Sequence, residues 1–150
     1  MKKINVNFLE PSPQQLNILL GYYQAGRYAD AEKLSLSITK KFPKHTFAWK
    51  VLGIVLKKTG RINEALFANQ KSVQLEPMNM ETNFNLGNTL QELGRLEEAE
   101  TCHRKAISIK PDYAEAHNNL GFTFQRIGRL EEAEVSYRKA IKLKPDYAEA

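Results

Sequence analysis

Two stretches of 34 residues decide the fold: METNFNLGNTLQELGRLEEAETCHRKAISIKPDY at 80–113 and AEAHNNLGFTFQRIGRLEEAEVSYRKAIKLKPDY at 114–147. They are identical at 21 of 34 positions. The same register continues backwards through residues 46–79 to residues 12–45, which form the most diverged copy. We number these copies repeats 1 to 4 from the N-terminus. A period of this length is typical of proteins in which each repeat is a small structural element stacked on its neighbours.

Each repeat carries the same residue types at the same offsets. A proline closes each copy, a Gly-Arg pair lies in its middle, an alanine follows five residues after that glycine, and three copies have an early Leu-Gly pair. These are Pro43, Pro77, Pro111 and Pro145; Gly26, Gly60, Gly94 and Gly128; Ala31, Ala65, Ala99 and Ala133; and Leu52-Gly53, Leu86-Gly87 and Leu120-Gly121.

These offsets predict two antiparallel helices in each repeat. In repeat 4, Leu120, Phe124 and Ile127 recur at the spacing of one helix face, and Gly128 then ends the helix. A second helical pattern follows until Pro145, which cannot continue a helix. We expect first helices near 13–25, 46–59, 80–93 and 114–127, and second helices near 28–41, 62–75, 96–109 and 130–143.

Stacked helix pairs predict an all-α fold, a right-handed α-solenoid of helix-turn-helix repeats with a concave face. Small residues such as Gly121 and Ala133 let the two helices of a repeat approach closely. The expected organisation is a leader or cap at 1–11, four repeats over 12–147 (12–45, 46–79, 80–113 and 114–147), and the start of a fifth, truncated repeat at 148–150. Since the last helix would then lack a cover, we expect self-association through that C-terminal end.

The chain resembles the tetratricopeptide repeat family over residues 12–150. The family's W-x2-L-G-x2-Y pattern corresponds to Trp49, Leu52, Gly53 and Leu56, and its A-x3-F position holds Ala133 and Tyr137. Two departures are Asn69 and His103, which replace the usual aromatic residue of that position. The resemblance implies a scaffold that binds a peptide or protein segment in its concave groove.

A narrower resemblance covers PSPQQLNILLGYYQAGRYADAEKLSLSITKKFPKHTFAWKVLG at 11–53. This stretch is similar to bacterial repeat regions that precede a catalytic domain of the SPINDLY-type O-linked N-acetylglucosamine transferase, sulfotransferase or methyltransferase kind. It implies an alternative function, a substrate-docking arm of a larger enzyme whose catalytic domain lies beyond residue 150.

The family's groove is lined by fixed positions of each first helix. Carried over to this chain, the candidate site comprises Asn17, Tyr23, Phe47, Lys50, Ile54, Lys57, Glu81, Phe84, Asn85, Asn88, Gln91, Glu115, Asn118, Asn119, Phe122, Gln125 and Arg126.

Two features of this set bear on the ligand. Asn17, Asn85 and Asn119 share one repeat position, which resembles the asparagine ladder of the O-linked N-acetylglucosamine transferase superhelix, although Val51 interrupts it and asparagine is common there in the family. An amide can donate to and accept from a peptide backbone. The second feature is Lys50 with Lys57, which suit an acidic peptide or a terminal carboxylate. Lys50 and Asn85 match the family's chaperone-binding clamp, but Ile54, Glu115 and Asn119 do not, so we do not expect chaperone-tail binding.

Other chemistry is not indicated. Cys102 and His103 are adjacent, so on a helix their side chains diverge, and the three histidines form no metal-binding pair. There is no phosphate-binding glycine motif, and we expect neither a cofactor nor enzyme activity in this chain. No apolar run approaches the length of a membrane span, and nothing resembles a signal peptide, so we expect a cytoplasmic protein.

Charge is uneven along the chain. Residues 1–79 hold 12 Lys and Arg against 5 Asp and Glu, whereas residues 80–150 hold 10 against 12. The basic first part would attract acidic partners, although solvated surface lysines explain it as well. The acidic second part argues against RNA bound along the whole solenoid, and we expect no nucleic-acid or membrane partner.

Overall fold

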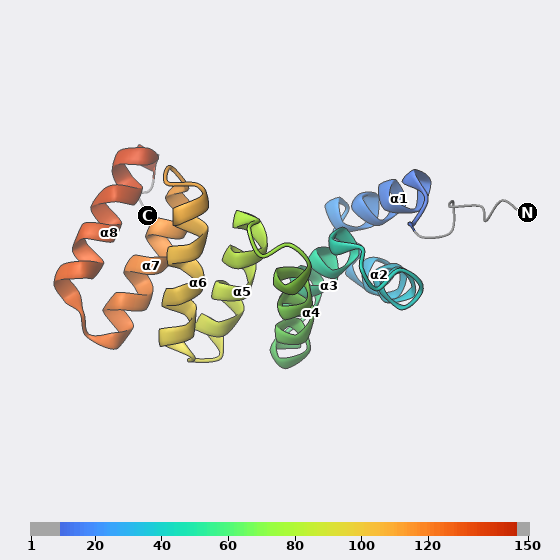
Figure 1. The fold of residues 1–150 in the computed structure, drawn as a ribbon, viewed down its shortest axis with the longest axis horizontal. Coiled ribbons are helices and arrows are strands. Elements are labelled where there is room, and N and C mark those ends of the chain that lie inside the picture. The colour runs from blue at the N-terminus through green and yellow to red at the C-terminus, as the bar shows by residue number, and fades with distance from the viewer. Residues whose placement is uncertain (1–9, 147–150) are drawn as a thin grey trace, which may run out of the picture. The chain divides into compact units, whose positions relative to one another are not determined.

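The computed structural model describes residues 10–146, and in that range it contains eight α-helices and no strand. The first helices of the repeats are α1 (Pro13–Gln24), α3 (Thr46–Lys58), α5 (Met80–Glu92) and α7 (Ala114–Ile127). The second helices are α2 (Tyr28–Lys41), α4 (Ile62–Leu75), α6 (Leu96–Ile109) and α8 (Leu130–Leu143). Every boundary lies within one residue of the expected one, and the predicted all-α class is confirmed (Figure 1). Most of the leader or cap expected at 1–11, namely residues 1–9, lies outside the described residues, and so does the fifth repeat expected to start at 148–150.

The turn inside each repeat is made by its mid-repeat glycine. Gly26, Gly60, Gly94 and Gly128 have φ values of 70°, 81°, 74° and 88°. A side chain is strained in this left-handed region, which explains why glycine recurs there. The arginine that follows each glycine pairs with the carboxylate three residues later, as Arg95 does with Glu98 at 2.7 Å. That hydrogen bond lowers the pKa of Glu98 and holds the carboxylate at the positive end of α6.

Two helix starts are fixed by local caps. Ser12 accepts a hydrogen bond from the Gln15 amide at 3.2 Å, while the Gln15 side chain accepts one from the Ser12 amide at 3.1 Å. Asn79 accepts from the amides of Glu81 and Thr82, which begins α5. Such caps satisfy backbone donors that have no partner within the helix.

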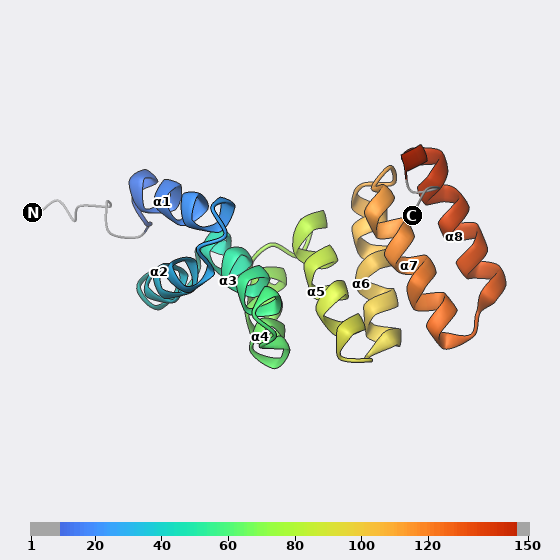
Figure 2. The same ribbon diagram turned by 180° about the vertical axis from the view of Figure 1, so that it is seen from behind.

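The helices form two compact halves, an N-terminal half that ends at Leu75 and a C-terminal half that begins at Glu76. Each half holds four helices, which Figures 1 and 2 show from opposite sides. The core of the N-terminal half includes Leu19, Ile38 and Val55. In the C-terminal half, Leu120 and Phe124 of α7 pack with Ala133 of α8 and with Ile107 of α6.

The two helices of a repeat come close at a glycine of the first helix. A Cβ atom added to Gly53 would lie 2.2 Å from Asn69 Oδ1, one on Gly87 would lie 2.7 Å from the His103 ring, and one on Gly121 would lie 2.9 Å from the Tyr137 ring. Asn69 and His103, the departures from the family pattern, are buried at these contacts. Each glycine therefore makes room for the large side chain that packs on it.

In repeat 1 the larger residue of this pair lies on the first helix and the smaller one on the second. Leu19 replaces the glycine and Ser35 replaces the large partner, and both are completely buried. The pair of positions thus combines a small residue with a larger one in every repeat, while the helix that carries the larger one changes. Close packing of protein interiors requires such compensation, because both gaps and overlaps cost stability.

We expect Gly87→Ala to destabilise the fold by about 1–3 kcal/mol, because the new methyl overlaps the buried His103 ring. The matched control is Gly21→Ala in α1, where an added Cβ meets no atom within 4 Å. There alanine should stabilise by about 0.5–1 kcal/mol through its helix propensity. The free energy of unfolding in urea measures both effects. Equal effects of the two substitutions would show that the close approach at Gly87 does not limit stability.

Combining Gly87→Leu with His103→Ser copies the pair found in repeat 1. We expect the double variant to be more stable than Gly87→Leu alone, because the smaller serine releases the overlap. A double-mutant cycle from urea unfolding measures the coupling. Strictly additive effects would contradict the exchange of volume between these positions.

Candidate functional site

The predicted site residues of the C-terminal half are brought together between α5 and α7. Asn119 Nδ2 donates to Asn88 Oδ1 at 2.6 Å, and Thr123 Oγ1 lies 2.8 Å from Gln91 Oε1. Arg126 Nη1 donates to the carbonyl of Gln91 at 3.2 Å. We call Asn85, Asn88, Gln91, Asn119, Phe122 and Arg126 the α5–α7 face. Thr123 was missed by the sequence reasoning, although Thr89 occupies the same position of repeat 3.

Asn85 has the least satisfied side chain of this face. Its Nδ2 atom is buried and has no hydrogen-bond partner within residues 10–146. Asn85 lies three residues before Asn88, so both belong to one face of α5. An unsatisfied buried donor costs about 1–3 kcal/mol. A side-chain rotation that brings this amide to the surface of the face would let a bound carbonyl oxygen recover that energy.

Exposed groups of α7 border the amides. Phe122 is 42% exposed, and the Arg126 guanidinium lies 5.9 Å from the centre of its ring. Gln125 is exposed as well and accepts a hydrogen bond from the Tyr137 hydroxyl of α8 at 2.9 Å. The face thus combines an aromatic surface, a cation and amides that can donate and accept.

Other predicted residues of the C-terminal half have mixed surroundings. The Phe84 ring is half-buried, with its centre 4.8 Å from the Tyr113 ring and 5.8 Å from the His103 ring, so it contributes to packing between helices. Glu115 pairs with Lys144 at 3.4 Å. Glu81 and Asn118 are half-buried.

In the N-terminal half, the predicted residues lie on α1 and α3, which contact each other directly. Tyr23 and Phe47 pack against the buried cluster that contains Leu19 and Val55. Asn17 is exposed on α1. Lys50, Ile54 and Lys57 are half-buried on α3. Two aromatic residues of the predicted site therefore also support the core.

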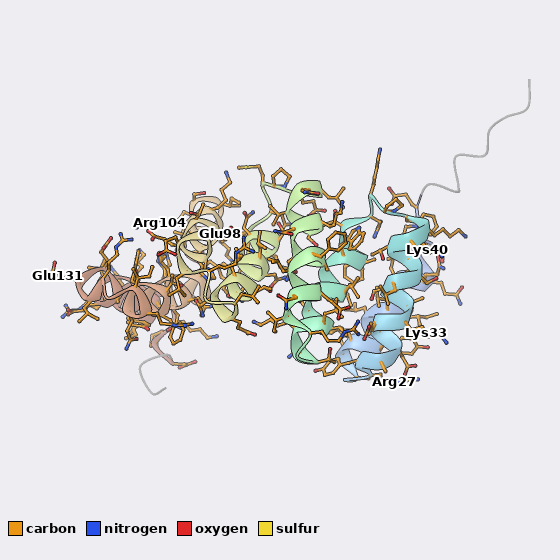
Figure 3. All side chains as sticks on the ribbon, turned by 90° about the horizontal axis from the view of Figure 1, so that it is seen from below. Arg27, Lys33, Lys40, Glu98, Arg104 and Glu131 are labelled. Atoms are coloured by element: carbon orange, nitrogen blue, oxygen red, sulfur yellow. The ribbon has the colours of Figure 1, made fainter. Side chains whose placement is uncertain are left out.

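The basic character of the N-terminal half is borne by exposed side chains. Arg27, Lys33 and Lys40 are all exposed at or within α2, where Figure 3 labels them. Arg27 pairs with Asp30 at 2.8 Å. Exposed cations of this kind raise the local concentration of acidic partners.

The surroundings of Cys102 lower the reactivity of its thiol. Burial, with a smaller effect of nearby Glu98, raises the pKa of the Cys102 thiol to about 11. The thiol is therefore protonated at neutral pH and is a poor nucleophile. Within residues 10–146, no three side chains of His, Cys, Asp or Glu gather as a metal site. None of the described helices is both long and apolar enough to span a membrane.

Comparison with known proteins agrees with this architecture. The family model described as tetratricopeptide repeat matches residues 79–146. No curated protein sequence matches the chain significantly. The similarity of residues 11–53 to repeat regions of larger enzymes stays a prediction.

Several solved structures of MamA share the fold. A crystal structure of MamA superposes with a TM-score of 0.82 at 22% identity, covering 91% of this chain and 80% of that one. MamA from Desulfovibrio magneticus RS-1 superposes with a TM-score of 0.81 at 23% identity, covering 88% of this chain and 75% of that one. MamA of AMB-1 superposes with a TM-score of 0.78 at 25% identity, covering 88% of this chain and 78% of that one. Residues 79–146 thus match the tetratricopeptide repeat family, and the chain as a whole shares its fold with MamA.

Proposed function

We propose that this chain is a protein-interaction scaffold that binds an extended segment of a partner protein on the α5–α7 face. The observation that carries the proposal is the buried, unpartnered Nδ2 donor of Asn85 beside the hydrogen-bonded amides of Asn88 and Asn119. A peptide backbone offers a carbonyl every residue, so it can satisfy such a donor whatever its sequence.

The flanking groups support an extended peptide over a folded partner. Phe122 offers exposed apolar surface for one side chain of the segment, and Arg126 offers a charge-assisted donor. A substrate-docking arm of a larger enzyme would use the same face, and we keep the cytoplasm as the proposed location.

Substitution of Asn85 separates this function from a structural role. We expect Asn85→Leu to raise the unfolding temperature, because it removes an unsatisfied buried donor, and to weaken peptide binding about tenfold. The probe is a 12-residue peptide selected on the intact chain from a random display library, with affinity measured by calorimetry. Glu97→Gln on the exposed start of α6 is the control and should leave the affinity for the peptide unchanged. Lowered stability together with unchanged affinity would contradict the proposal.

Self-association is a second candidate function, favoured by the exposed end of repeat 4. Leu130 is 65% exposed and Ile141 38%, and both line a hollow of about 300 Å³ with Tyr137, Glu134 and Arg138. Their counterparts in repeat 3, Leu96 and Ile107, are half-buried, since α7 packs against α6. An apolar surface that is covered in one repeat and exposed in the next is suited to a second copy.

Repeat 1 offers a complement to this end. The Arg129 guanidinium lies 4.5 Å from the centre of the Phe124 ring and reaches Glu100 of repeat 3 at 2.8 Å. In repeat 1 the Arg27 guanidinium lies 4.5 Å from the Tyr22 ring in the same way, and in repeat 4 Glu134 has the position of Glu100. A head-to-tail contact between copies would pair Arg27 with Glu134.

Charge reversal tests this contact. We expect sedimentation to show concentration-dependent association of the original chain and monomers for Arg27→Glu and for Glu134→Arg. Mixing the two variants in equal amounts should restore concentration-dependent association, because each head then complements the tail of the other variant. Monomeric behaviour of the original chain at all concentrations, or association that neither reversal affects, would contradict this contact.

A further inference from the structure

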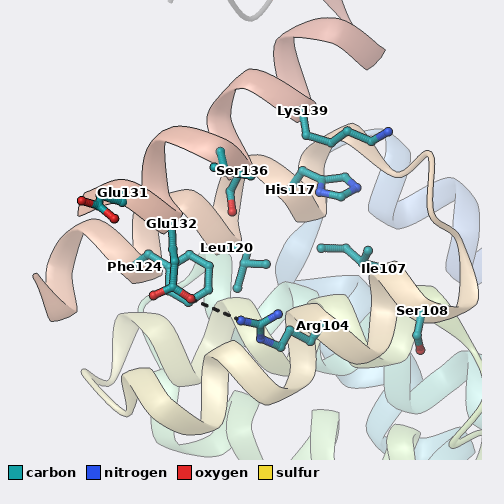
Figure 4. A pocket seen from close by; sticks show the side chains of 11 residues that line it. Arg104, Ile107, Ser108, His117, Leu120, Phe124, Glu131, Glu132, Ser136 and Lys139 are labelled. Carbon is teal, nitrogen blue, oxygen red and sulfur yellow. Dashed lines mark ion pairs between the residues drawn. The ribbon is translucent and has the colours of Figure 1, made fainter. Parts of the chain in front are cut away.

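A pocket of about 680 Å³ lies between α6 and α8, with α7 as its floor (Figure 4). Leu120 and Phe124 of α7 and Ile107 of α6 provide the apolar floor. His117, Val135 and Lys139 line its sides. None of these six residues belongs to the α5–α7 face, so the pocket is a separate feature of the C-terminal half.

Repeat 2 shows what fills the equivalent place. Trp49 and Phe67 occupy the positions of His117 and Val135, with their ring centres 5.9 Å apart in an edge-to-face arrangement. Trp49 packs on a buried cluster that includes Leu52 and Leu56, the counterparts of Leu120 and Phe124. The floor of the place is thus covered by Trp49, and Phe67, itself 56% exposed, packs edge-to-face on that indole.

Repeat 4 keeps the hydrogen bond that holds the first-helix side chain, but its side chains at both positions are smaller. Trp49 Nε1 donates to the carbonyl of Pro43 at 2.9 Å, and His117 Nε2 lies 2.8 Å from the carbonyl of Pro111. The imidazole is therefore held where the indole is held, but it lacks the second ring, and Val135 lacks the phenyl group. The pocket is the volume that these smaller side chains leave over the apolar floor.

The charges at the two ends of the pocket differ. At one end Glu132 pairs with Arg129 and lies 3.9 Å from Arg104, the ion pair drawn in Figure 4. At the other end Lys139 extends beside His117, and within residues 10–146 it forms no ion pair. The Glu132 carboxylate at the first end is thus neutralised, although Glu131, which also lines the pocket, is not paired within residues 10–146, and a cation is available at the second end.

We propose that this pocket binds a bulky aromatic side chain of a partner protein, with a carboxylate beside that side chain paired to Lys139. The aromatic group would fill the volume beside Val135, which is 68% exposed, as the ring pair Trp49 and Phe67 fills the equivalent place in repeat 2. Burying an aromatic ring supplies most of the binding free energy, and the ion pair fixes the orientation of the bound segment.

Three short probes test the chemistry on the intact, isotope-labelled chain: Ac-Glu-Trp-Glu-NH2, Ac-Lys-Trp-Lys-NH2 and Ac-Glu-Ala-Glu-NH2. In nuclear magnetic resonance titrations we expect the acidic tryptophan probe to shift the signals of Leu120, Phe124 and Val135. It should bind about threefold more tightly than the basic probe, as an exposed ion pair allows. The alanine probe should bind about tenfold or more weakly than either. Equal binding of all three probes, or shifts confined to other residues, would overturn the proposal.

Filling the pocket gives the decisive variant. The double substitution His117→Trp with Val135→Phe transplants the pair of repeat 2 and should weaken the acidic probe about tenfold or more while the chain stays folded. Thr101→Phe is the matched control, since Thr101 is exposed at the same position of repeat 3 and does not line the pocket. It should bind the probe as the original chain does. Unchanged binding by the filled variant would overturn the proposal.

Lys139→Glu tests the proposed ion pair without altering the apolar floor of the pocket. Lys139 is exposed, so the variant should fold normally, and it should reverse the preference between the acidic and basic tryptophan probes. A preference that does not change would exclude the pairing of a partner carboxylate with Lys139.

Discussion

The close packing of the two helices at one pair of positions is the contact on which the repeats depend. Gly53, Gly87 and Gly121 leave room for a larger side chain of the second helix, whereas repeat 1 has the larger residue, Leu19, on the first helix and Ser35 on the second. Once two helices pack at this distance, the positions of all their other side chains follow from helical periodicity. The amides between α5 and α7 and the pocket between α6 and α8 both result from that spacing. A methyl group at the contact would therefore affect surfaces well away from it.

The sequence allowed the helices to be predicted almost residue by residue, because glycine, proline and apolar spacing act locally. The details of the site could not be predicted in that way. The hydrogen bond from Asn119 to Asn88, and the absence of one to Asn85 Nδ2, depend on rotamers chosen across two repeats. Phe84 was assigned to a groove by family position, yet its ring packs against His103 and Tyr113. The pocket of repeat 4 had a sequence signal, since His117 and Val135 stand where Trp49 and Phe67 stand in repeat 2.

The C-terminal half presents two chemically different surfaces. Between α5 and α7, amides that include the unpartnered Asn85 donor lie on one face with Phe122 and Arg126, which suits recognition of a peptide backbone. Between α6 and α8, an apolar floor lies under small side chains, which suits recognition of a single aromatic group. Because α7 contributes different residues to each, the two surfaces can be altered separately. A scaffold of this kind could hold a partner by its main chain on one surface and by one side chain on the other.

Hydrogen exchange of the intact chain, with and without a peptide selected for binding, tests the central claim most directly. Amide exchange reports local opening, which a bound segment suppresses in the helices that it contacts. Binding on the α5–α7 face predicts slower exchange in Met80–Glu92 and Ala114–Ile127, with little change in Leu96–Ile109 and Leu130–Leu143. Protection confined to α6 and α8, or to the N-terminal half, would contradict the assignment of peptide binding to this face.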